Sequence, residues 1–269
     1  MKAFDYYGRY HFVPKTIEML LEFETKLSKS GYSLDRELGL IMEQEDIRYM
    51  STPPDVIPFA RAGVDGIHYG FLTDFGSVED LEQAFIVCVS PMDFGNEVWL
   101  VAKNIHDFLR VVYSENSILY NHFSDVDSYI RYIENKPFEE PDEKKRYVME
   151  TLKETFSLEP IDDMPQYVRD LHTHRKQAIA VSTLNHLGVV QISPVQQHER
   201  FDFESADVGD IEMVRSFFTR VSLESKFAFI REAQAKHCFE DAELRDFACK
   251  ELHAIGLVDE AKRLELSYT

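Results

Sequence analysis

The sequence lacks the motifs of several large enzyme classes. Neither Gly-x-x-x-x-Gly-Lys nor Gly-x-Gly-x-x-Gly occurs, and these are the spacings at which backbone amides hold a phosphate. A Gly-x-Ser-x-Gly nucleophile elbow is also missing. These absences disfavour nucleotide hydrolysis and acyl transfer, and we expect a non-enzymatic protein that uses no cofactor.

Cysteine is scarce, and the spacing of the three cysteines does not match a metal-binding or redox motif. Cys88, Cys238 and Cys249 stand far apart, no Cys-x-x-Cys occurs, and their apolar neighbours are typical of buried thiols. The first residues lack the apolar segment of a secretory signal, and no apolar run is long enough to cross a bilayer. Together these features predict a protein of the reducing cytoplasm that does not associate with membranes.

Basic residues are outnumbered by acidic ones. The chain has 29 Lys and Arg against 48 Asp and Glu, which gives a formal net charge of −19. Such a charge repels phosphate backbones and anionic lipid surfaces, so we expect no direct contact with nucleic acid. A high net charge can also serve solubility alone. The distribution of the charge along the chain is therefore more informative about function than its total.

The stretch between Arg61 and Lys103 contains no Lys or Arg at all. Uncompensated carboxylates repel one another, and they are tolerated most easily on a solvated face or on a face that meets a cationic partner. Both interpretations stay open at this point. Tyr69 and Trp99, which lie among these acids, are expected in the core because of their apolar neighbours. The candidate partner-binding residues are Asp65, Asp74, Glu79, Asp80, Asp93 and Glu97.

The first half of the chain has the pattern of an α+β domain. An amphipathic helix is predicted between Pro14 and Gly31, followed from residue 57 by β-branched and aromatic segments with turn residues between them. The segments 85–89 and 98–102 predict a pair of strands, and Asn104 is a typical N-cap for a helix that covers the sheet. The expected fold is an antiparallel sheet flanked by helices.

The second half is predicted to contain two further units. The charged, proline-containing stretch 136–146 favours a boundary, so we divide the chain into an α+β domain at 1–137 and an extension at 138–204. The extension would hold helices, a β-hairpin and a linker. Residues 205–269 read as helical throughout, with apolar stripes typical of a helical hairpin bundle.

One histidine pair is a candidate for metal chemistry. His172 and His174 lie two residues apart with Asp170 beside them, and two imidazoles with a carboxylate can bind a divalent ion. On a helix, however, side chains two residues apart point in nearly opposite directions. We therefore expect exposed polar histidines here, and a metal-dependent enzyme is the third of three functional hypotheses.

One pattern extends over the first half of the chain. It consists of Pro58-Phe59, Gly63, Asp65-Gly66 and Phe71, then the strands 85–89 and 98–102, and then the helix with Phe108-Leu109. Through these residues, the segment from 1 to about 135 resembles the SUKH superfamily, which includes yeast Smi/Knr-type regulators and many bacterial immunity proteins. The resemblance implies an α+β fold without catalytic residues and, in bacteria, a role in neutralising a toxin.

Two hypotheses therefore precede the metal enzyme. The first is a protein-binding protein of the immunity type, whose acidic surface would capture a cationic toxin domain and whose association would weaken in salt. The second is a regulatory or scaffold protein that binds its partner through the helices of 205–269.

Overall fold

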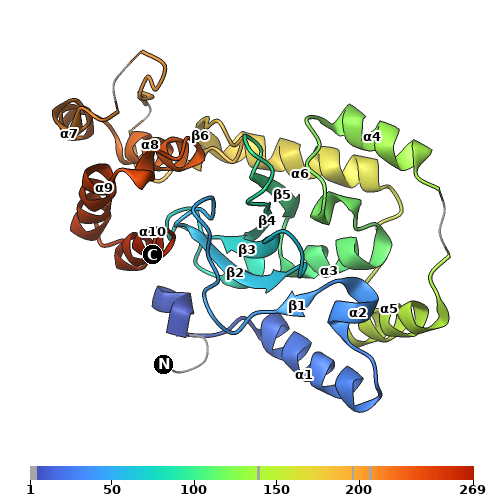
Figure 1. The fold of residues 1–269 in the computed structure, drawn as a ribbon. Coiled ribbons are helices and arrows are strands. Elements are labelled where there is room, and N and C mark those ends of the chain that lie inside the picture. Colours follow the sequence, from blue (N-terminus) through green and yellow to red (C-terminus); the bar gives the residue numbers. More distant parts are fainter. Residues whose placement is uncertain (1–4, 138–139, 196, 206–207) are drawn as a thin grey trace.

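The structure is a computed structural model, and it describes residues 5–137, 140–195, 197–205 and 208–269. It confirms the predicted α+β class, with a five-stranded antiparallel sheet, a small two-stranded sheet and a helical C-terminal part (Figure 1). The predicted boundary at 137–138 and the predicted linker each include residues outside the described ranges.

The central sheet has the strand order β1-β2-β3-β4-β5, so each strand pairs with its neighbour in sequence. The β2–β3 and β4–β5 connections are the shorter ones, and the first contains the Asp65-Gly66 dipeptide that predicts a hairpin between two apolar segments. A small hairpin, β6 and β7, forms separately. The strands are β1 (Ile41–Met42), β2 (Val56–Arg61), β3 (His68–Leu72), β4 (Phe85–Val89), β5 (Val98–Ala102), β6 (Ile179–Val181) and β7 (Val189–Val190).

One face of the central sheet lies under the first helices of the chain. Side chains at alternate strand positions, such as Phe71 and Trp99, join a large apolar core with α1 and α3. Asn104 caps α3 as predicted, since its side chain accepts a hydrogen bond from the Asp107 amide at 2.8 Å. Helices that contribute to this core are α1 (Lys15–Lys29), α2 (Leu34–Leu38), α3 (Ile105–Ser114), α4 (Val126–Asn135) and α5 (Glu143–Phe156).

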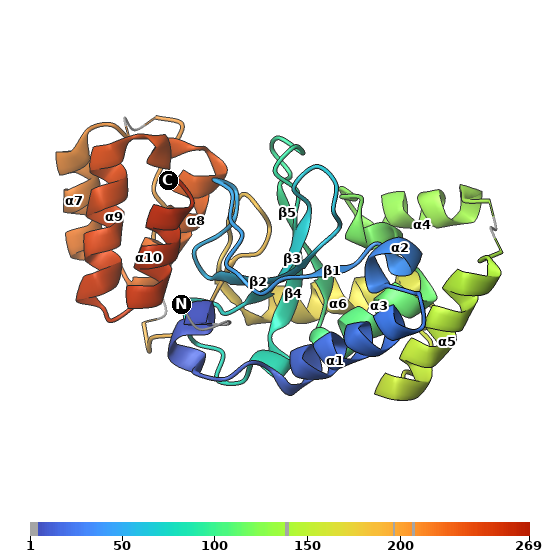
Figure 2. The same cartoon turned by 60° about the horizontal axis from the view of Figure 1, so that its bottom comes forward.

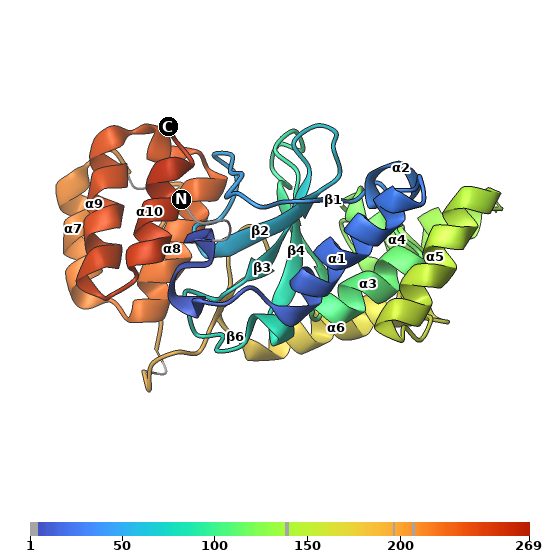
Figure 3. The same cartoon turned by 90° about the horizontal axis from the view of Figure 1, so that it is seen from below.

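The opposite face of the sheet lies against α6 (Met164–Ala178) and the loop between β6 and β7. The intervening strand residues, such as Leu72 and Val87, meet Leu171 of α6 and Leu187 of that loop. Because both faces are covered, the strands are buried almost throughout. Figures 2 and 3 show the sheet between these helices.

The C-terminal helices form a second apolar core beside the sheet. This core is rich in phenylalanine, and it includes Phe75 from the segment after β3, whose ring stacks on Phe227 with centroids 4.1 Å apart. The 3-10 helix Asp5–Tyr10 also reaches this part, because the Arg9 amide donates to Asp259 at 2.7 Å. The helices are α7 (Ile211–Arg220), α8 (Leu223–Ala235), α9 (Ala242–Ala254) and α10 (Val258–Leu266).

Candidate functional site

Two neighbouring turns form one end of the central sheet. Because the strands are antiparallel, the turn between β2 and β3 and the turn between β4 and β5 lie at the same end, side by side in Figure 3. A Cβ atom added to Gly66 would lie 3.2 Å from Pro91 and 2.9 Å from Tyr49. With its positive φ of 71°, Gly66 therefore lets three chain segments meet closely.

These turns carry exposed apolar and acidic side chains together. Phe94 is 75% exposed, Met92 is 61% exposed and Val64 is 50% exposed. Asp65 and Asp93 are exposed beside them. We call these five residues the turn surface. Apolar side chains gathered in this way at the surface are typical of a protein interface.

The six candidate acids do not form one surface. Asp65 and Asp93 belong to the turn surface, whereas Glu79 and Asp80 lie at the opposite end of the sheet, in the connection between β3 and β4. Asp80 also has a local role, because its side chain accepts a hydrogen bond from the Glu82 amide at 2.9 Å. Only the first pair of acids therefore adjoins exposed apolar side chains of the two turns.

The remaining two candidate acids, Asp74 and Glu97, are buried. Glu97 lies at the start of β5, where its carboxylate is 3.5 Å from Nε2 of His237. Asp74 follows β3 and contacts two arginines. Neither side chain is exposed enough to meet a partner directly, since Asp74 is 5% and Glu97 is 7% exposed.

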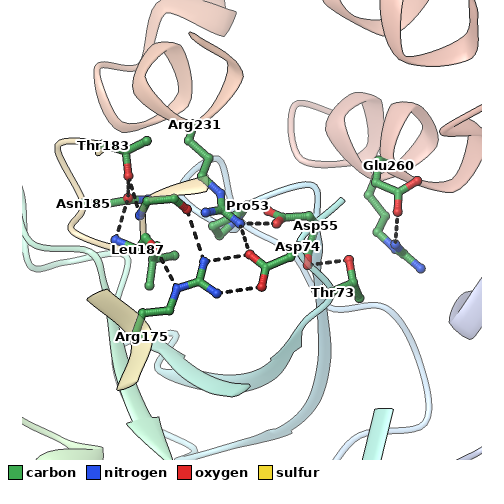
Figure 4. A network of polar contacts seen from close by, with 12 residues as sticks. Pro53, Asp55, Thr73, Asp74, Arg175, Thr183, Asn185, Leu187, Arg231 and Glu260 are labelled. Carbon is green, nitrogen blue, oxygen red and sulfur yellow. Dashed lines mark hydrogen bonds and ion pairs between the residues drawn. The ribbon is translucent and has the colours of Figure 1, made fainter. Parts of the chain in front are cut away.

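Asp74 is the centre of a buried network of ion pairs (Figure 4). Arg175 donates to both of its carboxylate oxygens at 2.6 and 2.7 Å, and Arg231 contacts it at 3.2 Å. Arg231 also donates to Asp55. Burial alone would raise the pKa of Asp74, but the hydrogen bonds and charge of Arg175, together with Arg231, hold that pKa below its usual value.

The network joins four parts of the fold. Asp55 and Asp74 flank the paired ends of β2 and β3, and Thr73 fixes this end because its amide donates to the Asp55 carbonyl at 2.8 Å. Arg175 comes from α6 and also donates to the Leu187 carbonyl at 2.7 Å. Arg231 comes from α8. The network therefore fixes both helices and the β6–β7 loop against the sheet.

A cleft of about 370 Å³ opens beside β5, between α6 and the β6–β7 loop. Its floor includes Trp99, and three histidines line it, His122, His172 and His186. Partial burial, followed by the nearby imidazoles of His186 and His122, lowers the pKa of His172. Burial likewise lowers the pKa of His122, so the cleft favours the neutral form of these two imidazoles.

The predicted pair of histidines does not converge. Both residues lie on α6, as the helical pattern predicts, but His172 faces the cleft whereas the His174 ring lies 5.9 Å from the ring of Phe85. Within the described ranges, no group of three or more His, Cys, Asp or Glu side chains could hold a metal ion. The arrangement gives the metal hypothesis no further support.

Sequence reasoning missed the arginines of the network. One signal was present for Arg231, which stands within the run Phe227 to Ala233, where nearly every other residue is apolar or small. An arginine in such a run needs a buried carboxylate as partner. The partner itself, 157 or 176 residues earlier in the chain, could not be read from that pattern.

Comparison with models of known protein families finds no match for this chain, and comparison with curated proteins finds none either. Among the helices of the described residues, none is both long enough and apolar enough to span a membrane.

Proposed function

We propose that this chain is a non-enzymatic protein-binding protein of the SUKH type, and that it neutralises a basic protein such as a toxin domain. The turn surface carries this proposal, because two adjacent turns expose apolar side chains and carboxylates together. The resemblance of residues 1 to about 135 to SUKH proteins, many of which are immunity proteins, supports the same class.

The apolar part of the turn surface would provide most of the affinity. Burial of apolar area contributes about 25 cal/mol for each Å² removed from water. Phe94 is the largest exposed side chain of the two turns, and an aromatic ring at the centre of an interface is a common energetic anchor. Met92 beside it has a flexible side chain that can adapt to the shape of a partner.

The acidic part would select the partner by charge. The stretch from 62 to 102 contributes no Lys or Arg, and Asp65 and Asp93 are exposed within it. The net charge of −19 attracts a cationic protein over several ångströms and raises the rate of encounter. A nuclease toxin has to be basic to hold its own substrate, so it fits this charge pattern.

The direct test is titration calorimetry of the purified chain against basic toxin domains encoded beside it, at low and at moderate salt. Asp93→Asn should lower the affinity and weaken its dependence on salt, because one carboxylate of the turn surface is lost. Glu79→Gln, at the opposite end of the sheet, removes one charge elsewhere and serves as the matched control. Failure to bind any such domain at either salt concentration would refute the proposal.

The same experiment separates this proposal from binding through the C-terminal helices. Val258, the first residue of α10, has an exposed aliphatic side chain. It is distant in sequence from both turns. If Val258→Ser weakens binding whereas Asp93→Asn leaves it unchanged, the partner binds the helical part. Assays on the full chain are preferable, since Arg231 of α8 is buried against Asp55 of the N-terminal half.

A further inference from the structure

The cleft beside β5 gathers basic and protonatable side chains from three segments of the chain. They are His122 after the 3-10 helix Ser117–Leu119, His172 and Lys176 on α6, and His186 in the β6–β7 loop. His172 and Lys176 are four residues apart, so their side chains are neighbours on one face of the helix. Nitrogen donors are thus concentrated at one place in a chain whose net charge is −19.

These four side chains are accessible from solution. His172, Lys176 and His186 are exposed, and His122 is partly exposed. Within the described ranges, no hydrogen bond or ion pair joins any of the four side chains to another group. A polar group that enters the cleft can therefore bind them without the loss of an existing partner.

The charges around the cleft favour an anion that carries a single charge. Lys176 supplies a permanent positive charge, and each imidazole adds to it when protonated. Arg175 in the wall is already paired with Asp74. The Asp125 carboxylate is occupied at the start of α4, because it accepts a hydrogen bond from the Ser128 amide at 2.7 Å. One unpaired ammonium group balances a carboxylate better than it balances a phosphate dianion.

The rest of the wall suits a flat apolar body. Phe123, Val126 and Ile179 are partly exposed and line the cleft, and Trp99 lies in the floor with its ring centroid 5.7 Å from that of His122. A cavity of about 150 Å³ is large enough to hold benzene. The cleft of about 370 Å³ therefore has room for two fused rings.

We infer that this cleft binds a small aromatic carboxylate. The carboxylate accepts from the ammonium group of Lys176 and from the imidazole of His172 on the same face of α6, while the ring system lies against Phe123 and Ile179. No residue of the turn surface lines the cleft. The site takes a small molecule, so it does not depend on the proposed protein partner.

The imidazoles make the binding depend on pH. Burial lowers the pKa of His122 and of His172 below 6.5, so both gain charge only as the solution becomes acidic. A bound carboxylate stabilises the charged imidazole, and affinity should therefore increase as the pH falls toward 6. The other charged and titratable groups that face these imidazoles are Asp93, Asp125, Tyr129, Arg175, Lys176 and His186.

The test is a calorimetric titration of the full chain with 2-naphthoate, and with 2-naphthamide as the matched neutral compound, at about pH 8 and about pH 6. The carboxylate should bind about tenfold more tightly than the amide at the lower pH, and more weakly at the higher pH. Equal affinities for the two compounds, or an affinity for the carboxylate that does not fall at the higher pH, would overturn the inference.

The only tryptophan of the chain reports where the carboxylate binds. Trp99 lines the cleft and gives the one indole N–H signal in the NMR spectrum of the labelled protein. This signal should shift in a saturable way with 2-naphthoate. A saturable heat of binding without any shift of the indole signal would place the ligand elsewhere and refute the assignment.

Matched variants identify the groups that bind the carboxylate. His172→Gln and Lys176→Gln each remove one nitrogen donor from the cleft, and each should weaken 2-naphthoate binding about fivefold. His174→Gln changes an exposed imidazole of the same helix that does not line the cleft, and Lys262→Gln removes an exposed ammonium group from α10. Both should bind as the wild type does. Equal affinities in all four variants would contradict the assigned contacts.

Discussion

Arg175 and Asp74 form a bidentate ion pair inside the protein, with nitrogen to oxygen distances of 2.6 and 2.7 Å, across a sequence separation of 101 residues. Arg231 contacts the same carboxylate from α8 at 3.2 Å. One buried side chain thus connects α6 and α8 to the sheet. Loss of that carboxylate would leave two buried guanidinium groups with too little negative charge around them.

The first prediction concerns this ion pair. Asp74→Asn should lower the free energy of unfolding by about 3–5 kcal/mol, because removal of one partner leaves an uncompensated buried charge. Urea denaturation followed by circular dichroism measures the change. The matched control is Asp246→Asn on α9, whose ion pair with Lys250 is largely exposed, and it should cost less than about 1 kcal/mol. Equal losses in the two variants would contradict the structural role of the network.

The second prediction concerns pH. His68 is buried, its Nδ1 lies 2.7 Å from the Gly66 carbonyl and its Nε2 lies 3.0 Å from the Thr52 hydroxyl. Burial, opposed by the Gly66 hydrogen bond, lowers its pKa from 6.5 to about 4. Between these values the unfolded chain binds a proton that the folded protein does not. This histidine should therefore reduce stability by about 1.4 kcal/mol for each unit that the pH falls below 6.5.

Urea denaturation at several pH values in this window isolates the contribution of one histidine. His68→Gln should unfold at a lower urea concentration at neutral pH, but its stability should depend less steeply on pH than that of the wild type. His106→Gln changes an exposed histidine on α3 and should retain the wild-type slope. A slope that is the same in all three proteins would show that His68 does not titrate as described.

The sequence predicted the local features of the fold well. Strand segments alternate between two apolar faces, and a short polar side chain marks a helix start, so the central strands and the cap Asn104 could be recognised. The first helix begins after Pro14, as its position predicts. Each of these features depends on residues close together in the chain.

Contacts between distant segments could not be predicted in this way. Asp74 and the exposed Asp93 are both followed by Phe-Gly, yet Asp74 is buried because two arginines from later helices meet it. The exposure of Phe94 could not be predicted either. It depends on whether another segment covers the ring, and the turn sequence does not show this. The candidate site was therefore found only in part, through Asp65 and Asp93.

The third prediction concerns thiol reactivity. Cys88 and Cys249 are buried, and burial raises the pKa of Cys88 well above its usual value and that of Cys249 to about 11. Burial raises the pKa of Cys238 as well, but Cys238 is the one of the three thiols that is partly exposed. Because a chromogenic disulfide reagent has to reach the sulfur, Cys238 should react first in the folded protein, and more slowly than an unburied thiol would. Unfolding in urea should release the other two, and fast reaction of all three without urea would contradict these burial states.

The fourth prediction concerns the apolar centre of the turn surface. Phe94→Ser should weaken binding of a basic protein partner about tenfold, because an exposed aromatic ring at an interface loses its contact area when it is truncated. Stability should hardly change, since the ring is 75% exposed in the free protein. Phe12→Ser is the matched control, because Phe12 is 80% exposed but belongs to neither turn, and it should bind as the wild type does. Calorimetric titration measures both affinities. A loss of affinity in the Phe12 variant alone would contradict the location of the interface at the two turns.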